Sequence, residues 1–182
     1  MIVALSGTPG TGKTSVSNLL KEKEYAVISI NEVAFENNFV VGIDEKRDSK
    51  IIDIDKVNDY IKEHYKTTDI TIIEGHSSHL LKDVDKVIIL RCHPTELKKR
   101  LKSKGWKNDK IKENVEAETI DVILCEATEV HPANHLFEID TTHKKIESIA
   151  SSIIEILNNS FEPRTKYNIG TIDWSEEILK EF

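Results

Sequence analysis

The sequence predicts an α/β fold in which helices cover both faces of a five-stranded parallel sheet. Five short apolar segments alternate with segments whose apolar residues recur at helical spacing. Strands that are buried on both faces form continuous apolar runs, and parallel strands need a helical crossover between them. The length of 182 residues suits one domain, which can bury a sizeable core without a disulfide or a structural metal.

In the first half of the chain, each predicted strand is an apolar run and each predicted helix carries apolar residues on one face. Glycine and charged residues separate these segments, and Asp55 is placed to cap a helix. We therefore expect a strand at residues 2–5, a helix at 13–24, a strand at 26–30, a short helix at 31–39, an exposed loop that includes Gly42 and residues 44–50, and a helix at 56–65.

The second half continues the alternation. Pro94 suits the first turn of a helix, and Gly105 ends that helix. We expect strands at residues 70–73, 86–91 and 136–139, and helices at 94–103, from 109 through 123, and at 146–157. Residues 160–182 are too apolar for a solvated tail, so we expect them to pack on the domain formed by residues 1–159 or to bind a partner.

One motif carries a strong chemical signal, because it fits the pattern G-x-x-x-x-G-K-[ST]. It reads Gly7-Thr8-Pro9-Gly10-Thr11-Gly12-Lys13-Thr14 and lies between a predicted strand and a predicted helix. Its glycines let the backbone N–H groups point at phosphate oxygens, and the helix adds its positive N-terminal end. The motif predicts a phosphate-binding loop (P-loop), in which Lys13 faces solvent when empty and contacts the β- and γ-phosphates, and Thr14 binds Mg²⁺.

Two residues at the end of the third predicted strand are candidates for the same site. Glu74 lies next to the P-loop in a parallel sheet and can orient a water molecule on Mg²⁺. His76, two residues further on, can position a water molecule or sense the γ-phosphate, although a lone histidine is more often structural. His79 has a weaker claim, and we expect it to pack or form a hydrogen bond nearby.

Composition and charge exclude several classes of protein. The apolar runs are far shorter than a membrane span, the N-terminus has no basic region of a signal peptide, and two cysteines cannot form a disulfide scaffold. We therefore expect a cytoplasmic protein that spans no membrane. The net charge is −7, yet residues 98–112 carry +7, so the rest of the chain carries −14. That basic segment is either a solvated helix face or a phosphate-binding surface.

These motifs resemble those of the adenylate kinase isoenzyme 6 family, especially its archaeal members, over residues 1–157. The likeness depends on the P-loop, on Glu74-Gly75-His76, on Leu90-Arg91, and on Arg100 through Trp106 followed by the helix that begins near Lys110. Eukaryotic members have Asp where this chain has Glu74, an arginine near Phe35, and an arginine at the position of Lys104.

The resemblance implies a nucleoside monophosphate (NMP) kinase with ATPase activity and a role in small ribosomal subunit and pre-16S rRNA maturation. It implies Mg²⁺ as cofactor and, as partners, ATP, an NMP, a ribosomal protein of the uS11 type and the pre-ribosomal particle. Residues 31–53 correspond to the NMP-binding segment and residues 104–114 to the lid, with Arg100 as a second candidate to close over the phosphates. The resemblance implies that Gly10, Gly12, Lys13, Thr14 and Ser15 bind ATP. We expect Thr11 and Lys104 to contribute to ATP binding, and we expect Lys13, Glu74 and His76 to be catalytic residues.

The sequence leaves three functions open. The first is phosphoryl transfer from ATP to AMP or another NMP, and the second is a ribosome-assembly ATPase that docks and releases a ribosomal partner. The third is a kinase for a small metabolite such as shikimate or dephospho-coenzyme A. A switch GTPase is disfavoured, because the chain has no Asn-Lys-x-Asp string that reads guanine. The acidity outside residues 98–112 also predicts weak binding to naked RNA and favours a basic protein partner.

Overall fold

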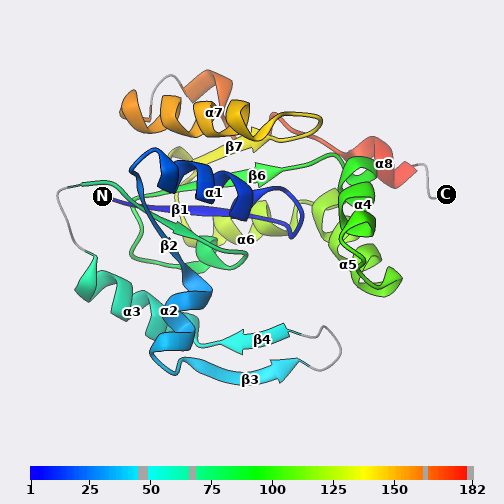
Figure 1. The fold of residues 1–182 in the computed structure, drawn as a ribbon. Coiled ribbons are helices and arrows are strands. Elements are labelled where there is room, and N and C mark those ends of the chain that lie inside the picture. Colours follow the sequence, from blue (N-terminus) through cyan, green and yellow to red (C-terminus); the bar gives the residue numbers. More distant parts are fainter. Residues whose placement is uncertain (45–48, 66–68, 162–163, 180–182) are drawn as a thin grey trace.

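The computed structural model describes residues 1–44, 49–65, 69–161 and 164–179. Its main sheet has five parallel strands in the order β2-β5-β1-β6-β7, which confirms the predicted fold class (Figure 1). The strands are β1 (Ile2–Gly7), β2 (Ala26–Ser29), β5 (Thr71–Glu74), β6 (Lys86–Arg91) and β7 (Leu136–Asp140). The P-loop strand β1 therefore lies at the centre of the sheet.

Helices cover both faces of this sheet, and each face has its own hydrophobic core. The helices are α1 (Lys13–Glu22), α2 (Ile30–Glu36), α3 (Ile54–His64), α4 (Pro94–Ser103), α5 (Asn108–Thr119), α6 (Val122–Val130), α7 (Ile146–Asn158) and α8 (Ser175–Leu179), with 3₁₀ turns at Ser78–Leu80, Ala133–His135 and Arg164–Lys166. Helices α1 and α7 pack on Val3 and Leu5, whereas α2, α3 and α6 pack on the side of Ile2 and Ala4. Alternate residues of β1 thus enter opposite cores, as the strand period of two requires.

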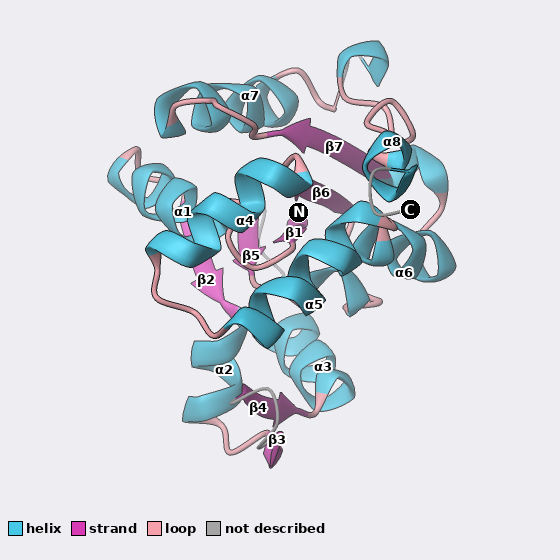
Figure 2. Cartoon of the chain, turned by 90° about the vertical axis from the view of Figure 1, so that its right-hand side faces the viewer, coloured by secondary structure: helices cyan, strands magenta, loops and turns pink. Residues whose placement is uncertain are grey.

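Helices α4 and α5 lie beyond the C-terminal ends of the strands (Figures 1 and 2). Leu97 and Leu101 of α4 and Ile111 of α5 form a third, smaller core with Cys92, and Trp106 packs against it. The basic residues of this region therefore lie next to a small apolar core at the C-terminal ends of the strands, where ligands bind in parallel α/β sheets.

The expected exposed loop after α2 was wrong in part, because much of it forms a hairpin. Strands β3 (Val40–Asp44) and β4 (Ser49–Ile52) pair antiparallel, and Gly42 lies within β3. The β-branched residues on both strands favour extended backbone, and they outweighed the glycine and the charges on which the loop prediction rested. Residues 45–48, between the strands, lie outside the described residues.

The long helix that we expected from residue 109 through residue 123 is also wrong, because it divides into α5 and α6. Asp121, between the two helices, has a left-handed backbone with φ 57°. Its carboxylate pairs with the guanidinium of Arg91 at the end of β6. The apolar spacing runs through this break, so the helical pattern alone does not reveal it.

The segment that follows α7 packs on the domain. Phe161 and Tyr167 are buried in the core beneath α7, and Glu138 of β7 donates its N–H to the Tyr167 carbonyl at 3.0 Å. Further along, Trp174 reaches α5, and Glu177 of α8 accepts a hydrogen bond from the Thr95 hydroxyl at 3.2 Å. Helix α8 lies at the same end of the sheet as α4 and α5, beyond the C-terminal ends of the strands (Figures 1 and 2).

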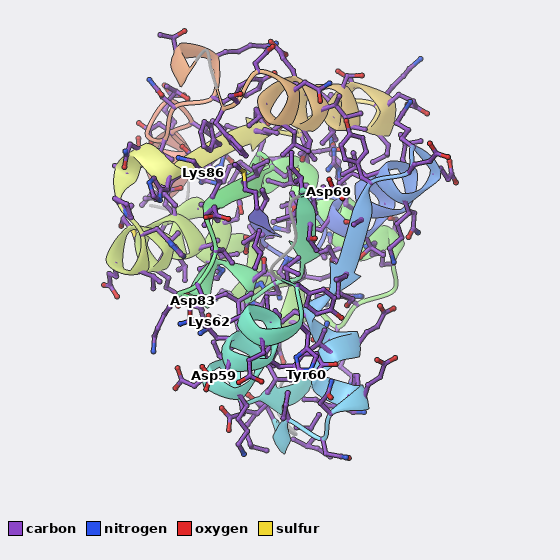
Figure 3. All side chains as sticks on the ribbon, turned by 90° about the vertical axis from the view of Figure 1, so that its left-hand side faces the viewer. Asp59, Tyr60, Lys62, Asp69, Asp83 and Lys86 are labelled. Carbon is purple, nitrogen blue, oxygen red and sulfur yellow. The ribbon has the colours of Figure 1, made fainter. Side chains whose placement is uncertain are left out.

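Polar contacts hold α3 to the connection between β5 and β6. Lys62 forms an ion pair with Asp83 at 2.9 Å (Figure 3), and Asn58 donates to the same carboxylate at 2.8 Å. Asp83 also donates its N–H to the Asn58 side-chain oxygen at 3.0 Å. These contacts fix α3, and with it the end of the β3–β4 hairpin, relative to the sheet.

Within the described ranges, no helix combines the length and the apolarity that a bilayer span requires.

Candidate active site

The P-loop connects β1 to α1 and packs closely against neighbouring elements. Gly7 and Gly10 have φ angles of 143° and 97°, which favour glycine. A Cβ on Gly10 would lie 2.8 Å from Leu97 Cδ1 and 2.9 Å from Leu101 Cδ2. The glycine at position 10 therefore lets the loop contact α4 directly.

Lys13 lies inside the P-loop, which corrects our expectation that it faces solvent. Its side chain is buried, and Nζ donates to the carbonyls of Gly7 at 2.6 Å and Thr8 at 3.1 Å. Two of the three donors of the ammonium group are thus taken up by carbonyl oxygens of the loop itself. Burial lowers the pKa of Lys13 to about 8, against the opposing charges of Glu74 and Glu118. At neutral pH the side chain thus carries a charge that is available for phosphate oxygens.

Thr14 and Glu74 lie next to each other, at the start of α1 and the end of β5. The Thr14 hydroxyl donates to Glu74 Oε1 at 3.5 Å. The register that pairs Leu5 with Glu74 brings this carboxylate to the P-loop end of the sheet. Burial raises the pKa of Glu74, and the charge of Lys13 opposes that shift. A hydroxyl and a carboxylate are ligands that suit Mg²⁺, so this pair fits the ion that the motif implies.

His76 follows the end of β5 and is exposed to a cavity beside the P-loop. The surrounding protein desolvates the ring and, together with the positive charge of Lys13, lowers the pKa of His76 to about 4, whereas a backbone hydrogen bond with Gly7 opposes the shift. The ring is therefore neutral at physiological pH and can both donate and accept a hydrogen bond.

The turn that carries His76 is braced by a buried histidine, His79. Its Nδ1 lies 2.9 Å from the Ser6 hydroxyl and 3.1 Å from the His76 carbonyl, and its Nε2 lies 2.9 Å from Glu126 Oε2. Burial lowers the pKa of His79, and the hydrogen bond and the charge of Glu126 oppose that shift without reversing it. These contacts agree with the hydrogen-bonding role that the sequence suggested for His79, and they connect the turn to α6.

The cavity beside His76 has a volume of about 760 Å³ and lies between the β3–β4 side of the molecule and α5. Two aromatic–lysine pairs line it: the Lys50 ammonium is 3.8 Å from the Phe35 ring centre, and the Lys110 ammonium is 4.7 Å from that of Trp106. Other lining residues include Thr8, Pro9, Asn31, Ile51, Ser77, Glu113, Asn114, Ile123 and Glu126. The cavity thus combines flat apolar surfaces with charged groups, as small-molecule sites do.

The remaining predicted residues occupy different surroundings. Thr14 and Ser15 are exposed, whereas Thr11 is buried and donates its hydroxyl to the Thr8 carbonyl at 2.9 Å. Lys104, exposed at the end of α4, is close enough for its charge to lower the pKa of Lys13. Arg100 bonds the Thr141 carbonyl at 2.8 Å, which directs its guanidinium toward the end of β7.

Sequence reasoning missed Glu118, a buried carboxylate of α5 that accepts a hydrogen bond from the Thr8 hydroxyl of the P-loop at 2.5 Å. Its other oxygen accepts from Arg91 Nε at 2.8 Å. One signal for the contact between Glu118 and Arg91 was present in the sequence. An arginine at the end of an apolar strand requires a carboxylate partner if it is buried, and Arg91 ends such a strand.

Comparison with known proteins places this geometry in context. Residues 3–121 match a family model described as an AAA domain. The protein named "Putative adenylate kinase" from Archaeoglobus fulgidus is 41% identical over 100% of this chain and 98% of its own length. A protein of the same name from Methanosarcina barkeri is 44% identical over 98% of this chain and 100% of its own.

Solved structures with low sequence identity share the fold. Shikimate kinase from Bacteroides thetaiotaomicron superposes with a TM-score of 0.52 at 17% identity, covering 87% of this chain and 98% of its own. Thymidylate kinase from Candida albicans gives a TM-score of 0.55 at 12% identity, covering 87% and 91%. Because the two archaeal relatives are 41% and 44% identical over nearly the whole chain, the chain belongs to the archaeal family that carries the name "Putative adenylate kinase".

Proposed function

We propose that this protein transfers the γ-phosphate of ATP to AMP or another nucleoside monophosphate. The observation that carries the proposal is the cavity of about 760 Å³ that borders the P-loop at Thr8 and Pro9 and includes His76 in its wall. An acceptor in this cavity would lie next to the phosphates held by the loop. The name shared by the relatives of similar length supports the same reaction.

In this proposal the donor nucleotide is held by the residues that the motif predicted. Lys13 leaves the carbonyls of Gly7 and Thr8 and contacts the β- and γ-phosphates, while Gly10, Thr11, Gly12, Thr14 and Ser15 surround them. Thr14 would hold Mg²⁺, with Glu74 orienting its water shell. The ion would neutralise charge on the transferred phosphate when bound. Lys104 approaches from α4 and excludes water, which otherwise hydrolyses the nucleotide.

The acceptor is held by the aromatic–lysine pairs of the cavity. Phe35 and Trp106 offer flat surfaces for a base, and Lys50 and Lys110 offer charge for its phosphate. His76, neutral at physiological pH, positions the acceptor or a water molecule near the transferred phosphate. Positioning and electrostatics account for most catalysis of phosphoryl transfer, so no protein base is required.

The test compares ADP formation from ATP and Mg²⁺ in the presence and the absence of AMP. We expect AMP to accelerate ADP formation and to be converted to ADP itself. Equal rates with and without each of the common monophosphates would contradict the kinase and favour the ATPase. Phosphorylation of a hydroxyl on a small metabolite instead would favour the third function.

A second candidate is a ribosome-assembly ATPase that binds a uS11-type ribosomal protein in the pre-ribosomal particle. The net charge of −14 outside residues 98–112 favours it, because acidic surfaces attract basic ribosomal proteins. The family resemblance suggests the partner, and we propose a cytoplasmic location for either function.

Calorimetry with purified uS11-type protein at physiological salt, with ATP, ADP or no nucleotide, tests this candidate. We expect binding whose affinity depends on the nucleotide. Lack of binding in every state would leave the metabolic kinase, and tight binding to naked RNA would contradict the charge argument.

A further inference from the structure

Glu118 joins the P-loop to the C-terminal segment, residues 164–179. Its Oε2 accepts the Thr8 hydroxyl, and its Oε1 accepts from Arg91 Nε, from the Cys92 N–H at 3.1 Å and from Trp174 Nε1 at 3.4 Å. The side chain is only 2% exposed. One buried carboxylate thus contacts groups that are more than a hundred residues apart in the sequence.

The C-terminal segment also helps to satisfy the carboxylates around Arg91. The guanidinium of Arg91 pairs with three of them, Glu118, Asp121 and Glu138, so the negative charges outnumber the positive one. Buried carboxylates of this kind need further donors. The C-terminal segment supplies two, since Gly170 donates its N–H to Glu138 Oε2 at 2.7 Å and Trp174 donates to Glu118.

Thr8 connects this cluster to the nucleotide site. Its carbonyl accepts from Lys13 Nζ at 3.1 Å, and its hydroxyl donates to Glu118. When phosphates attract Lys13, Thr8 loses that donor, and the charge of Lys13 moves away from Glu118. The hydrogen bonds from Thr8 and Trp174 then become more important for holding the carboxylate.

We propose that Glu118 is a positioning residue for the P-loop, and that it couples nucleotide binding to docking of the C-terminal segment. This inference rests on the proposed binding of nucleotide at the P-loop. Because linkage between two binding equilibria is reciprocal, a nucleotide that tightens the contact with Trp174 binds more weakly when Trp174 cannot donate.

The experiment measures ADP affinity by titration calorimetry with the full chain and three variants. Glu118→Gln removes the charge and leaves Asp121 and Glu138 to pair with Arg91. Trp174→Phe removes the indole donor and keeps an aromatic ring. Tyr167→Phe is the matched control, because it removes a 2.6 Å hydrogen bond from the same segment to Glu155 of α7.

We expect Glu118→Gln and Trp174→Phe each to weaken ADP binding about fivefold, and the double variant to weaken it by less than the product. Tyr167→Phe should bind ADP like the wild type. Amide hydrogen exchange gives a second readout that a purely structural role would not change. ADP should slow exchange at residues 170–177 in the wild type and in Tyr167→Phe, but not in Trp174→Phe.

The outcomes separate this inference from the proposed function. A wild-type protein that does not bind ADP would overturn both. Normal ADP binding by the wild type, with equal affinities in Trp174→Phe and Tyr167→Phe and no effect of ADP on exchange at residues 170–177, would overturn the coupling alone. If Glu118→Gln does not fold, the comparison of Trp174→Phe with Tyr167→Phe still decides the question.

Discussion

Gly75 lies so close to Ile30 that a Cβ atom on residue 75 would overlap Ile30 Cγ2. Ile30 is a fully buried residue at the start of α2, directly before residues 31–53, for which the family resemblance implies NMP binding. Gly75 separates Glu74 from His76, so this close packing sets the positions of both side chains at the end of β5.

We therefore predict that Gly75→Ala displaces Glu74 and His76 and destabilises the fold by about 1–3 kcal/mol, as overpacking in a core does. Turnover should fall more than ADP affinity does. Thermal unfolding and steady-state kinetics measure the two effects. In the double variant Gly75→Ala/Ile30→Ala the smaller side chain makes room, so the two losses of stability should not add. Additive losses would show that the contact is not the cause.

Lys13→Met should reduce phosphoryl transfer at least about a hundredfold while the fold survives, because it removes charge stabilisation of the transferred phosphate. Burial lowers the pKa of Lys13 to about 8, so between pH 8 and 10.5 the unfolded chain binds more protons than the folded protein. The stability of the wild type relative to Lys13→Met should therefore rise over this range. Thermal unfolding of both proteins from pH 7 to 10.5 measures it, and wild-type turnover in the variant would refute the P-loop assignment.

His76→Ala should lower turnover more than nucleotide affinity, because the ring lies beside the acceptor cavity. Since the pKa of His76 is lowered to about 4, the folded protein binds fewer protons than the unfolded chain between pH 4 and 6.5. Stability should thus fall with decreasing pH in this range, and the fall should be smaller in His76→Ala. His64→Ala, at an exposed histidine of α3, is the control. Unchanged hydrolysis and transfer rates in His76→Ala would return the residue to a structural role.

Lys50→Ala should raise the KM for AMP about tenfold and leave the KM for ATP unchanged, because Lys50 lines the acceptor cavity with Phe35. Lys56→Ala removes a lysine nearby that pairs with Asp53 at 3.3 Å, and it should change neither constant. Kinetics in which each substrate is varied in turn measure both values. An equal rise in both KM values would place Lys50 outside the acceptor site.

Lys104→Glu should raise the KM for ATP, and high salt should produce a weaker effect in the wild type, because exposed charges are screened. Lys112→Glu makes the same charge change in the same basic segment, at a side chain that pairs with Glu116, and should have less effect. We also expect a bisubstrate mimic to slow hydrogen exchange at residues 104–106. Hydrogen exchange at residues 104–106 that does not change when the ligand binds would count against a lid at residues 104–114.

The sheet could be predicted because its strands are buried on both faces and therefore form apolar runs in the sequence. The P-loop could be predicted because phosphate binding requires glycine, lysine and threonine at fixed spacing. The break at Asp121 could not, since Ile120 and Ile123 continue the helical spacing across it, and the ion pair of Asp121 with Arg91 joins distant parts of the chain.

The expectation that Lys13 faces solvent was wrong for a different reason. Its motif gives the bound role of the side chain but not its contacts in the empty loop, where the carbonyls of Gly7 and Thr8 take the place of phosphate. Likewise, no local pattern joins Thr8 to Glu118, because their contact depends on how α5 crosses the ends of the strands.

The central position of β1 has a consequence for synthesis of the protein. Strand β1 is made before both of its neighbours, β5 and β6, so residues 2–7 cannot be paired on both edges until residue 91 has been made. Until then, one of the most apolar segments of the nascent chain has unpaired backbone edges, which favours aggregation or chaperone binding. The order of the strands thus leaves the strand that carries the P-loop incompletely paired until residue 91 of the 182 has been made.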